Sequence, residues 1–148
     1  MVTTTEQDHP VPPISGTYSI PVRPARVLLA EDDHDMRGLL AEELRRDGYE
    51  VLEAKDGKEM ELRLKSVRHC PLQAPDVIVM DVRMPGHSGL EILAALRQAR
   101  WTTPVVLITG FPEPSLIASA HALQAEVFGK PFDIDALRVA VLSHRCAA

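Results

Sequence analysis

Side chains able to bind metal or phosphate stand directly after short apolar runs of this 148-residue chain. They are three neighbouring acids, a fourth acid, a hydroxyl and an ammonium: Glu31, Asp32, Asp33, Asp81, Thr109 and Lys130. Crowded carboxylates raise each other's pKa unless a positive group compensates. A hard cation such as Mg²⁺ is the natural compensator, since it prefers oxygen ligands from carboxylates and phosphate. A carboxylate can itself attack phosphorus, as in aspartyl-phosphate ATPases, so the set points to phosphoryl transfer.

Apolar runs and amphipathic stretches alternate along the chain and predict the elements that position these side chains. Continuous apolar runs are typical of strands buried on both faces of a parallel sheet. We expect strands at 27–30, 49–53, 76–80, 104–108 and 126–128, and helices at 34–47, 57–68, 90–100, 115–123 and from 133 onward. The alternation predicts an α/β fold with a doubly wound parallel sheet. Ligands bind at the carboxyl ends of such strands, where the chemical residues should meet.

Each of these residues also has an ordinary structural interpretation. Asp33 follows a strand and can serve only as a helix cap. Thr109 can be a loop hydroxyl, and Lys130 a solvated loop lysine. A chance arrangement of all of them at the correct strand ends is improbable, so we favour a functional site.

Composition bounds the function further. The net charge of −5 leaves no basic surface for nucleic acid, so direct binding to DNA is not expected. The N-terminus lacks the pattern of a secretory signal, and no apolar run is long enough for a membrane span. We therefore expect a cytoplasmic protein, in which Cys70 and Cys146 would be free thiols. Five prolines in residues 1–24 predict a flexible N-terminal tail, and residues 25–148 one folded domain.

Four segments resemble the receiver domains of two-component response regulators. They are LLAEDDHDMR (28–37), DVIVMDVRMPGHSGLEIL (76–93), VVLITG (105–110) and FGKPFDIDAL (128–137), and the resemblance extends from about residue 25 to the C-terminus. It implies a flavodoxin-like sheet of five strands in the order 2-1-3-4-5, with five helices.

The resemblance also implies a role for each site residue. Asp81 would be the phosphoacceptor, and Thr109 and Lys130 would bind the phosphoryl group. Glu31, Asp32, Asp81 and the backbone carbonyl of Arg83 would hold Mg²⁺ or Mn²⁺. The side chains of Arg83 and Phe111 would tune the lifetime of the phosphoryl group, and the bond before Pro131 would be cis.

Two features depart from the family pattern. The position three before the lysine usually carries Tyr or Phe as a rotameric reporter of phosphorylation, but here it is Val127. Phe128 is its neighbour and should face the other side of the strand. The segment 66–75 is longer than usual, which indicates either a surface loop or a partner-specific feature.

The resulting expectation is a signalling receiver rather than an enzyme, without its own output domain, that accepts phosphate from a histidine kinase or a histidine phosphotransfer protein. A receiver portion of a longer response regulator or hybrid histidine kinase is the alternative. The face formed by 115–123, 126–128 and the last helix is the family's usual contact surface, for a partner or for a homodimer. An aspartate-based phosphatase would need a second acid where Arg83 stands, and is disfavoured.

Overall fold

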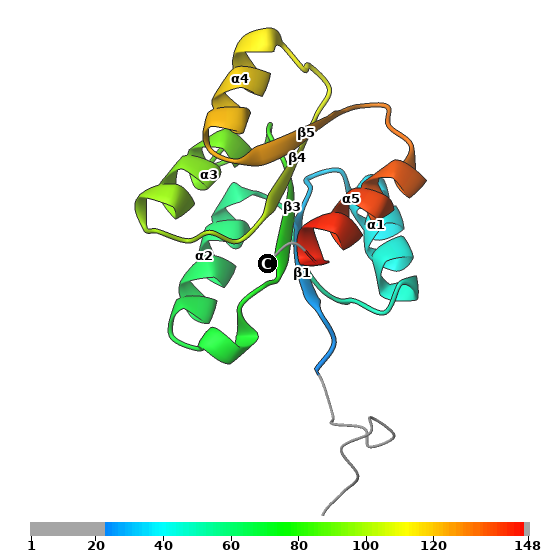
Figure 1. Cartoon of the computed structure of the whole chain (residues 1–148), viewed down its shortest axis with the longest axis vertical. Helices are drawn as coiled ribbons and strands as arrows, with labels where there is room; N and C mark the ends of the chain where they lie inside the picture. Colours follow the sequence, from blue (N-terminus) through cyan, green and yellow to red (C-terminus); the bar gives the residue numbers. More distant parts are fainter. Residues whose placement is uncertain (1–22, 147–148) are drawn as a thin grey trace, which may run out of the picture.

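The computed structural model describes residues 23–146, which form a five-stranded parallel sheet in the order β2-β1-β3-β4-β5 (Figure 1). The strands are β1 (Arg26–Ala30), β2 (Glu50–Ala54), β3 (Val77–Asp81), β4 (Val105–Thr109) and β5 (Ala125–Gly129). The helices are α1 (His34–Arg46), α2 (Gly57–Arg68), the 3₁₀ turn η2 (Pro71–Gln73), α3 (Gly89–Gln98), α4 (Pro114–Ala122) and α5 (Ile134–Cys146). The predicted flavodoxin-like fold is therefore confirmed.

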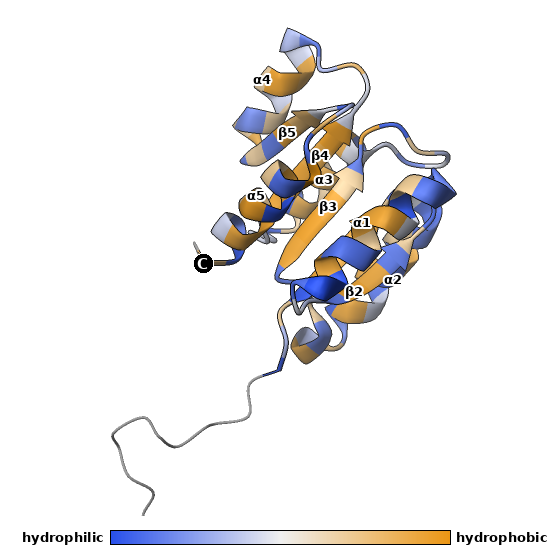
Figure 2. Cartoon of the chain, turned by 90° about the vertical axis from the view of Figure 1, so that its right-hand side faces the viewer, coloured by the Kyte–Doolittle hydropathy of each residue, from blue (hydrophilic) through white to orange (hydrophobic). Residues whose placement is uncertain are grey.

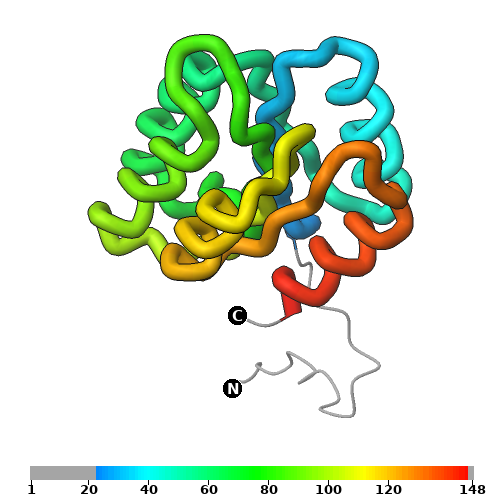
Figure 3. The backbone as a smooth tube through the Cα atoms, turned by 90° about the horizontal axis from the view of Figure 1, so that it is seen from above, coloured from blue at the N-terminus to red at the C-terminus, as the bar shows by residue number. Residues whose placement is uncertain are grey.

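Helices cover both faces of the sheet, with α1 and α5 on one side and α2, α3 and α4 on the other (Figures 1 and 3). Alternate residues of each strand supply two separate cores. Leu28 and Met80 pack with the α2–α3 side, whereas Leu29 and Val79 pack with the α1–α5 side. Figure 2 shows the strands as mainly hydrophobic, as expected of strands that are buried on both faces.

Helix boundaries follow local signals in the sequence. The Asp33 carboxylate accepts hydrogen bonds from the backbone N–H groups of Asp35 and Met36, which confirms it as the N-cap of α1. Gly48 follows that helix with φ of +93°, a conformation that favours glycine. At α3, Ser88 and Glu91 form a capping box.

Boundaries differ from the predicted ones by one or two residues, as at β2, which begins at Glu50 instead of residue 49. The long segment 66–75 is not a plain loop, because α2 continues to Arg68 and η2 follows. The N-terminal tail predicted for residues 1–24 lies almost wholly outside the described residues, so its predicted flexibility and the boundary at residue 25 stay predictions.

Candidate functional site

The predicted site residues meet at the carboxyl edge of the sheet, the edge seen from above in Figure 3. Glu31 follows β1, Asp81 ends β3, and Thr109 ends β4. These three are the buried polar or charged residues found among residues 23–146, with 0%, 4% and 1% of their surfaces exposed. Buried polar groups are costly unless they are paired, so their concentration at one edge indicates a functional site.

Lys130 connects two of these acids. Its Nζ lies 3.0 Å from Asp81 Oδ2 and 3.0 Å from Glu31 Oε1. Burial by itself lowers the pKa of Lys130, but hydrogen bonds with Glu31 and Asp81 outweigh that effect and raise the pKa above its usual value. The ammonium therefore remains charged and neutralises part of the acid cluster.

The pKa of Glu31 is strongly shifted by its surroundings. Burial, followed by the hydrogen bond to Asp81, raises the pKa of Glu31 to about 7. Its Oε2 accepts a hydrogen bond from the Asp33 N–H at 3.1 Å. Its Oε1 is fully buried, and the Lys130 ammonium at 3.0 Å is the charged partner that the structure gives it. Since this one ammonium also pairs with Asp81, the acid cluster keeps negative charge that an additional cation can neutralise.

Glu31, Asp32 and Asp81 form a group that could hold a metal ion, since one carboxylate oxygen from each lies within 4.8 Å of the others. Glu31 and Asp81 are buried, whereas Asp32 is exposed. A set of three carboxylates, two of which share a single ammonium, fits a hard divalent cation such as Mg²⁺. Asp33 is not a member of this group, because its carboxylate caps α1.

The Asp81 carboxylate is held in one orientation by two donors. Lys130 donates to Oδ2, and the backbone N–H of Arg83 donates to Oδ1 at 3.2 Å. Gly89 allows the following helix to pack closely, since a Cβ there would lie 2.5 Å from the Asp81 carbonyl oxygen. The first turn of α3 therefore packs directly against the backbone of Asp81.

Thr109 ends β4 and Lys130 follows β5, and a backbone hydrogen bond joins these two neighbouring strand ends. The Lys130 N–H donates to the Thr109 carbonyl at 2.6 Å, and the Phe111 N–H donates to the Thr109 hydroxyl at 3.0 Å. The Lys130–Pro131 bond is cis, as predicted. The two residues predicted to bind a phosphoryl group therefore lie where β4 and β5 end and the loops at the edge of the pocket begin.

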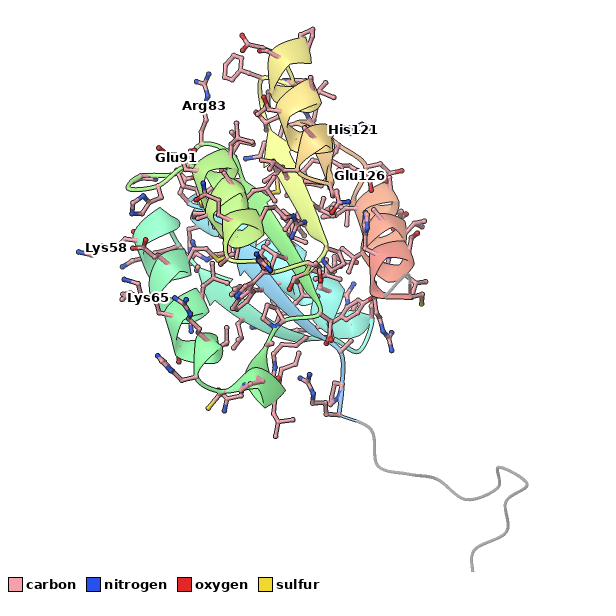
Figure 4. The ribbon with its side chains drawn as sticks, turned by 60° about the vertical axis from the view of Figure 1, so that its left-hand side comes forward. Lys58, Lys65, Arg83, Glu91, His121 and Glu126 are labelled. Atoms are coloured by element: carbon pink, nitrogen blue, oxygen red, sulfur yellow. The ribbon has the colours of Figure 1, made fainter. Side chains whose placement is uncertain are left out.

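Arg83 and Phe111 make a contact that the sequence did not predict. The guanidinium carbon of Arg83 lies 4.4 Å from the centre of the Phe111 ring, in cation–π geometry. Both residues are exposed, and Figure 4 shows Arg83 projecting outward from the loop after β3. The pair bridges the loop after Asp81 and the loop after Thr109.

Val127 and Phe128 face opposite sides of β5, as the strand period predicts. Val127 packs with the core on the α2–α3 side, and Phe128 packs with the α1–α5 core, where its ring meets Phe132 edge-on. Phe128 therefore does not replace the aromatic side chain that the family usually carries at position 127.

The fold and this acidic pocket define a phosphoacceptor-type signalling module, and comparisons with known proteins agree. The family model described as "Response regulator receiver domain" matches residues 27–142. The chain belongs to the response regulator receiver domain family of two-component systems. Among residues 23–146, no helix combines the length and the apolar character that a membrane crossing requires.

Individual relatives differ in how much of them the chain covers. It is 38% identical over 120 residues to the transcriptional regulatory protein PdtaR of Mycobacterium tuberculosis, with 80% of this chain and 55% of PdtaR aligned. It is 31% identical over 117 residues to sporulation initiation phosphotransferase F of Bacillus subtilis, with 78% of this chain and 90% of that protein aligned. The chain thus spans about half the length of PdtaR but most of the phosphotransferase.

Solved structures resemble the whole described domain. The Francisella response regulator 1452 receiver domain superposes with a TM-score of 0.75 at 26% identity, covering 83% of this chain and 98% of that one. The response regulator protein TrrA from Thermotoga maritima, in complex with Mg²⁺-BeF, gives a TM-score of 0.69 at 29% identity, with 81% and 98% covered.

Proposed function

We propose that Asp81 accepts a phosphoryl group from a histidine kinase or a histidine phosphotransfer protein. One observation carries the proposal: the buried Asp81 carboxylate shares Lys130 with Glu31 and lies in a three-acid group suited to a divalent cation. The complex of TrrA with Mg²⁺-BeF supports the same chemistry by similarity.

The chain's own residues supply positioning and charge. An oxygen of Asp81 attacks phosphorus, the bond from phosphorus to the donor atom breaks, and the phosphoryl group remains on Asp81. Lys130 and the Thr109 hydroxyl lie at strand ends from which they can bind the phosphoryl oxygens. Glu31, Asp32, Asp81 and the Arg83 carbonyl would hold Mg²⁺, which supplies positive charge to the phosphoryl oxygens when bound. The chain promotes only its own phosphorylation and dephosphorylation, so it is a signalling module rather than an enzyme.

The output is a change in a protein contact. Thr109 begins the loop that leads to α4, and the Pro112 ring of this loop packs against Gly129, where an added Cβ would lie 3.0 Å from Pro112 Cγ. Because Val127 replaces the usual aromatic switch, we assign the conformational change to residues 110–115. This change would alter the face of α4, β5 and α5 that a partner or a second copy contacts, without direct contact to nucleic acid.

Two settings for this receiver fit the relatives. In one it passes phosphate to a further protein, as the name of sporulation initiation phosphotransferase F indicates for that relative. In the other it is the receiver portion of a longer regulator, since PdtaR is about twice as long as the aligned part. Both settings require phosphorylation of Asp81.

The test is the mass of the intact chain after incubation with acetyl phosphate and Mg²⁺. Wild type and the control Asp33→Asn should each gain one phosphoryl group, because the Asp33 carboxylate only caps α1. Asp81→Asn should gain none, and omission of Mg²⁺ should suppress the gain. Equal labelling of Asp81→Asn and wild type would overturn the assignment.

A further inference from the structure

A groove runs between α2 and α3, on the outer surface of the α2–α3–α4 layer and away from the acidic pocket. It encloses about 330 Å³. Its lining includes Leu64 of α2, Ala95 of α3, Ala99 at the C-cap of α3, and Trp101 before β4. Ala95 and Ala99 are exposed and one helical turn apart, so their small side chains leave the space open.

The rim of the groove carries both signs of charge. Lys65 and Arg68 come from α2, and Glu91 comes from α3. Figure 4 shows Lys65 and Glu91 on the side of the molecule where these two helices lie. A rim with charges of both signs favours neither an acidic nor a basic peptide segment as the occupant of the groove. The apolar lining favours an uncharged segment. The half-exposed indole of Trp101 adds the aromatic surface on which proline-rich segments dock.

Residues 10–21 have the composition that this groove suits. Their sequence is PVPPISGTYSIP, in which four of twelve residues are proline and none is charged, within a chain that is 25% charged overall. Prolines favour the extended polyproline II conformation, which loses little entropy on binding. Val11 and Ile14 supply aliphatic side chains for an apolar lining.

The described chain enters β1 beside the turn that follows α2. Arg26, the first residue of β1, donates from its guanidinium to the carbonyl of Leu72 at 3.1 Å, in the turn that follows α2. Trp101 lies four residues before β4. In the sheet, β3 lies between β1 and β4, so the amino ends of β1 and β4 are two strand spacings apart. With neighbouring strands about 4.8 Å apart, this separation is about 10 Å.

The segment is also long enough. An extended chain advances about 3.3 Å per residue, so five residues before the described part span about 16 Å. The ten residues of α3 give the groove a length of about 15 Å. About five residues in the polyproline II conformation cover that length. Residues 18–22 can therefore bridge to the Trp101 end while residues 10–17 lie along the groove.

We propose that residues 10–17 dock in cis into the groove between α2 and α3, against Trp101. The occupant is this segment of the same chain, and the interaction is independent of phosphorylation at Asp81. The other occupant considered, a second copy of the chain, is distinguished from this one by the dependence of both effects on protein concentration.

Trp101 is the only tryptophan of the chain, so its fluorescence reports the groove directly. In the full chain, replacement of Val11 and Ile14 by Asp should shift the Trp101 emission to longer wavelength and increase its quenching by acrylamide. The matched control replaces Thr3 and Thr5 by Asp, which adds the same charge outside the segment and should leave the emission unchanged. All four positions lie outside the described domain, so its fold is not at risk.

A second measurement locates the segment. A nitroxide on Cys70, next to the α2 end of the groove in a Cys146→Ser background, should weaken the amide signals of residues 10–17 more in the otherwise unchanged chain than in the Val11/Ile14 variant, because both chains are tethered alike and only the first docks. Both effects should be independent of protein concentration. Unchanged emission in the Val11/Ile14 variant together with equal weakening of residues 10–17 in the two chains would overturn the proposal. An effect that disappears on dilution would assign the groove to a second copy and also overturn it.

Discussion

Removal of the Arg83 side chain is expected to shorten the lifetime of the phosphoryl group proposed on Asp81. The guanidinium lies over the Phe111 ring at 4.4 Å, and the two residues come from the loops that flank the pocket. We expect the pair to hinder the approach of a hydrolytic water to the phosphoryl group, because its two residues come from the loops that follow Asp81 and Thr109. The backbone carbonyl proposed as a metal ligand is unaffected by a change of the side chain.

The magnitude follows from the exposure of the pair. Both residues are exposed, so the interaction contributes about 0.5–1 kcal/mol. If the pair must separate before water enters, its loss raises the open population, and with it the hydrolysis rate, by about two- to fivefold. Phe111→Ala should give the same increase, since either change removes the same contact.

The assay follows the decay of the phosphorylated chain after the phosphodonor is removed and Mg²⁺ is kept constant. Arg83→Ala, Phe111→Ala and the double variant form a double-mutant cycle. The double variant should hydrolyse no faster than either single variant, and Phe111→Tyr, which keeps an aromatic ring, should resemble wild type. Independent, multiplicative effects, or slower hydrolysis in Arg83→Ala, would refute the reasoning.

Three further outcomes are expected. Asp32→Ala should weaken Mg²⁺ binding more than Asp33→Ala, because only the first acid belongs to the metal group; isothermal titration giving the reverse order would contradict this assignment. Burial raises the pKa of Glu31 from 4.5 to about 7, so without metal its contribution to the free energy of unfolding is complete below pH 4.5 and is lost as the pH rises through 7. Chemical unfolding at several pH values should show this decline in wild type and not in Glu31→Gln; parallel profiles would argue against it. Beryllofluoride with Mg²⁺ should change amide exchange mainly in residues 110–120, and changes centred on residues 126–130 would instead favour a side-chain switch on β5.

Much of the fold could be predicted because its signals are local. The residues of β3 before Asp81 are apolar on both faces of the strand, which is typical of a buried parallel strand. Gly48 marks the end of α1 because glycine readily adopts a positive φ, and Asp33 marks its start because its carboxylate accepts hydrogen bonds from the first N–H groups of the helix. Parallel strands place their carboxyl ends at one edge, so the convergence of Glu31, Asp81 and Thr109 also followed from the pattern.

The remaining features depend on how loops and helices pack, which no local pattern specifies. The Arg83–Phe111 contact joins two separate loops, and the groove beside Trp101 exists only once α2 and α3 lie together. The turn Pro71–Gln73 did carry a local signal, since proline favours the first position of a helical turn. The family pattern indicated only that the segment 66–75 is longer than usual, as a surface loop or a partner-specific feature.

The account rests on an acyl phosphate at Asp81, and borohydride reduction tests it most directly. Borohydride reduces an aspartyl phosphate to homoserine, which marks the phosphorylated position in a peptide mass spectrum. After acetyl phosphate and Mg²⁺, we predict homoserine at position 81, at no other acid of the pocket, and none when the phosphodonor is omitted. Homoserine at position 32 or 33, 2-amino-5-hydroxypentanoic acid (the reduction product of a glutamyl phosphate) at position 31, or no homoserine at 81 in a chain whose intact mass shows the added phosphoryl group, would contradict the account.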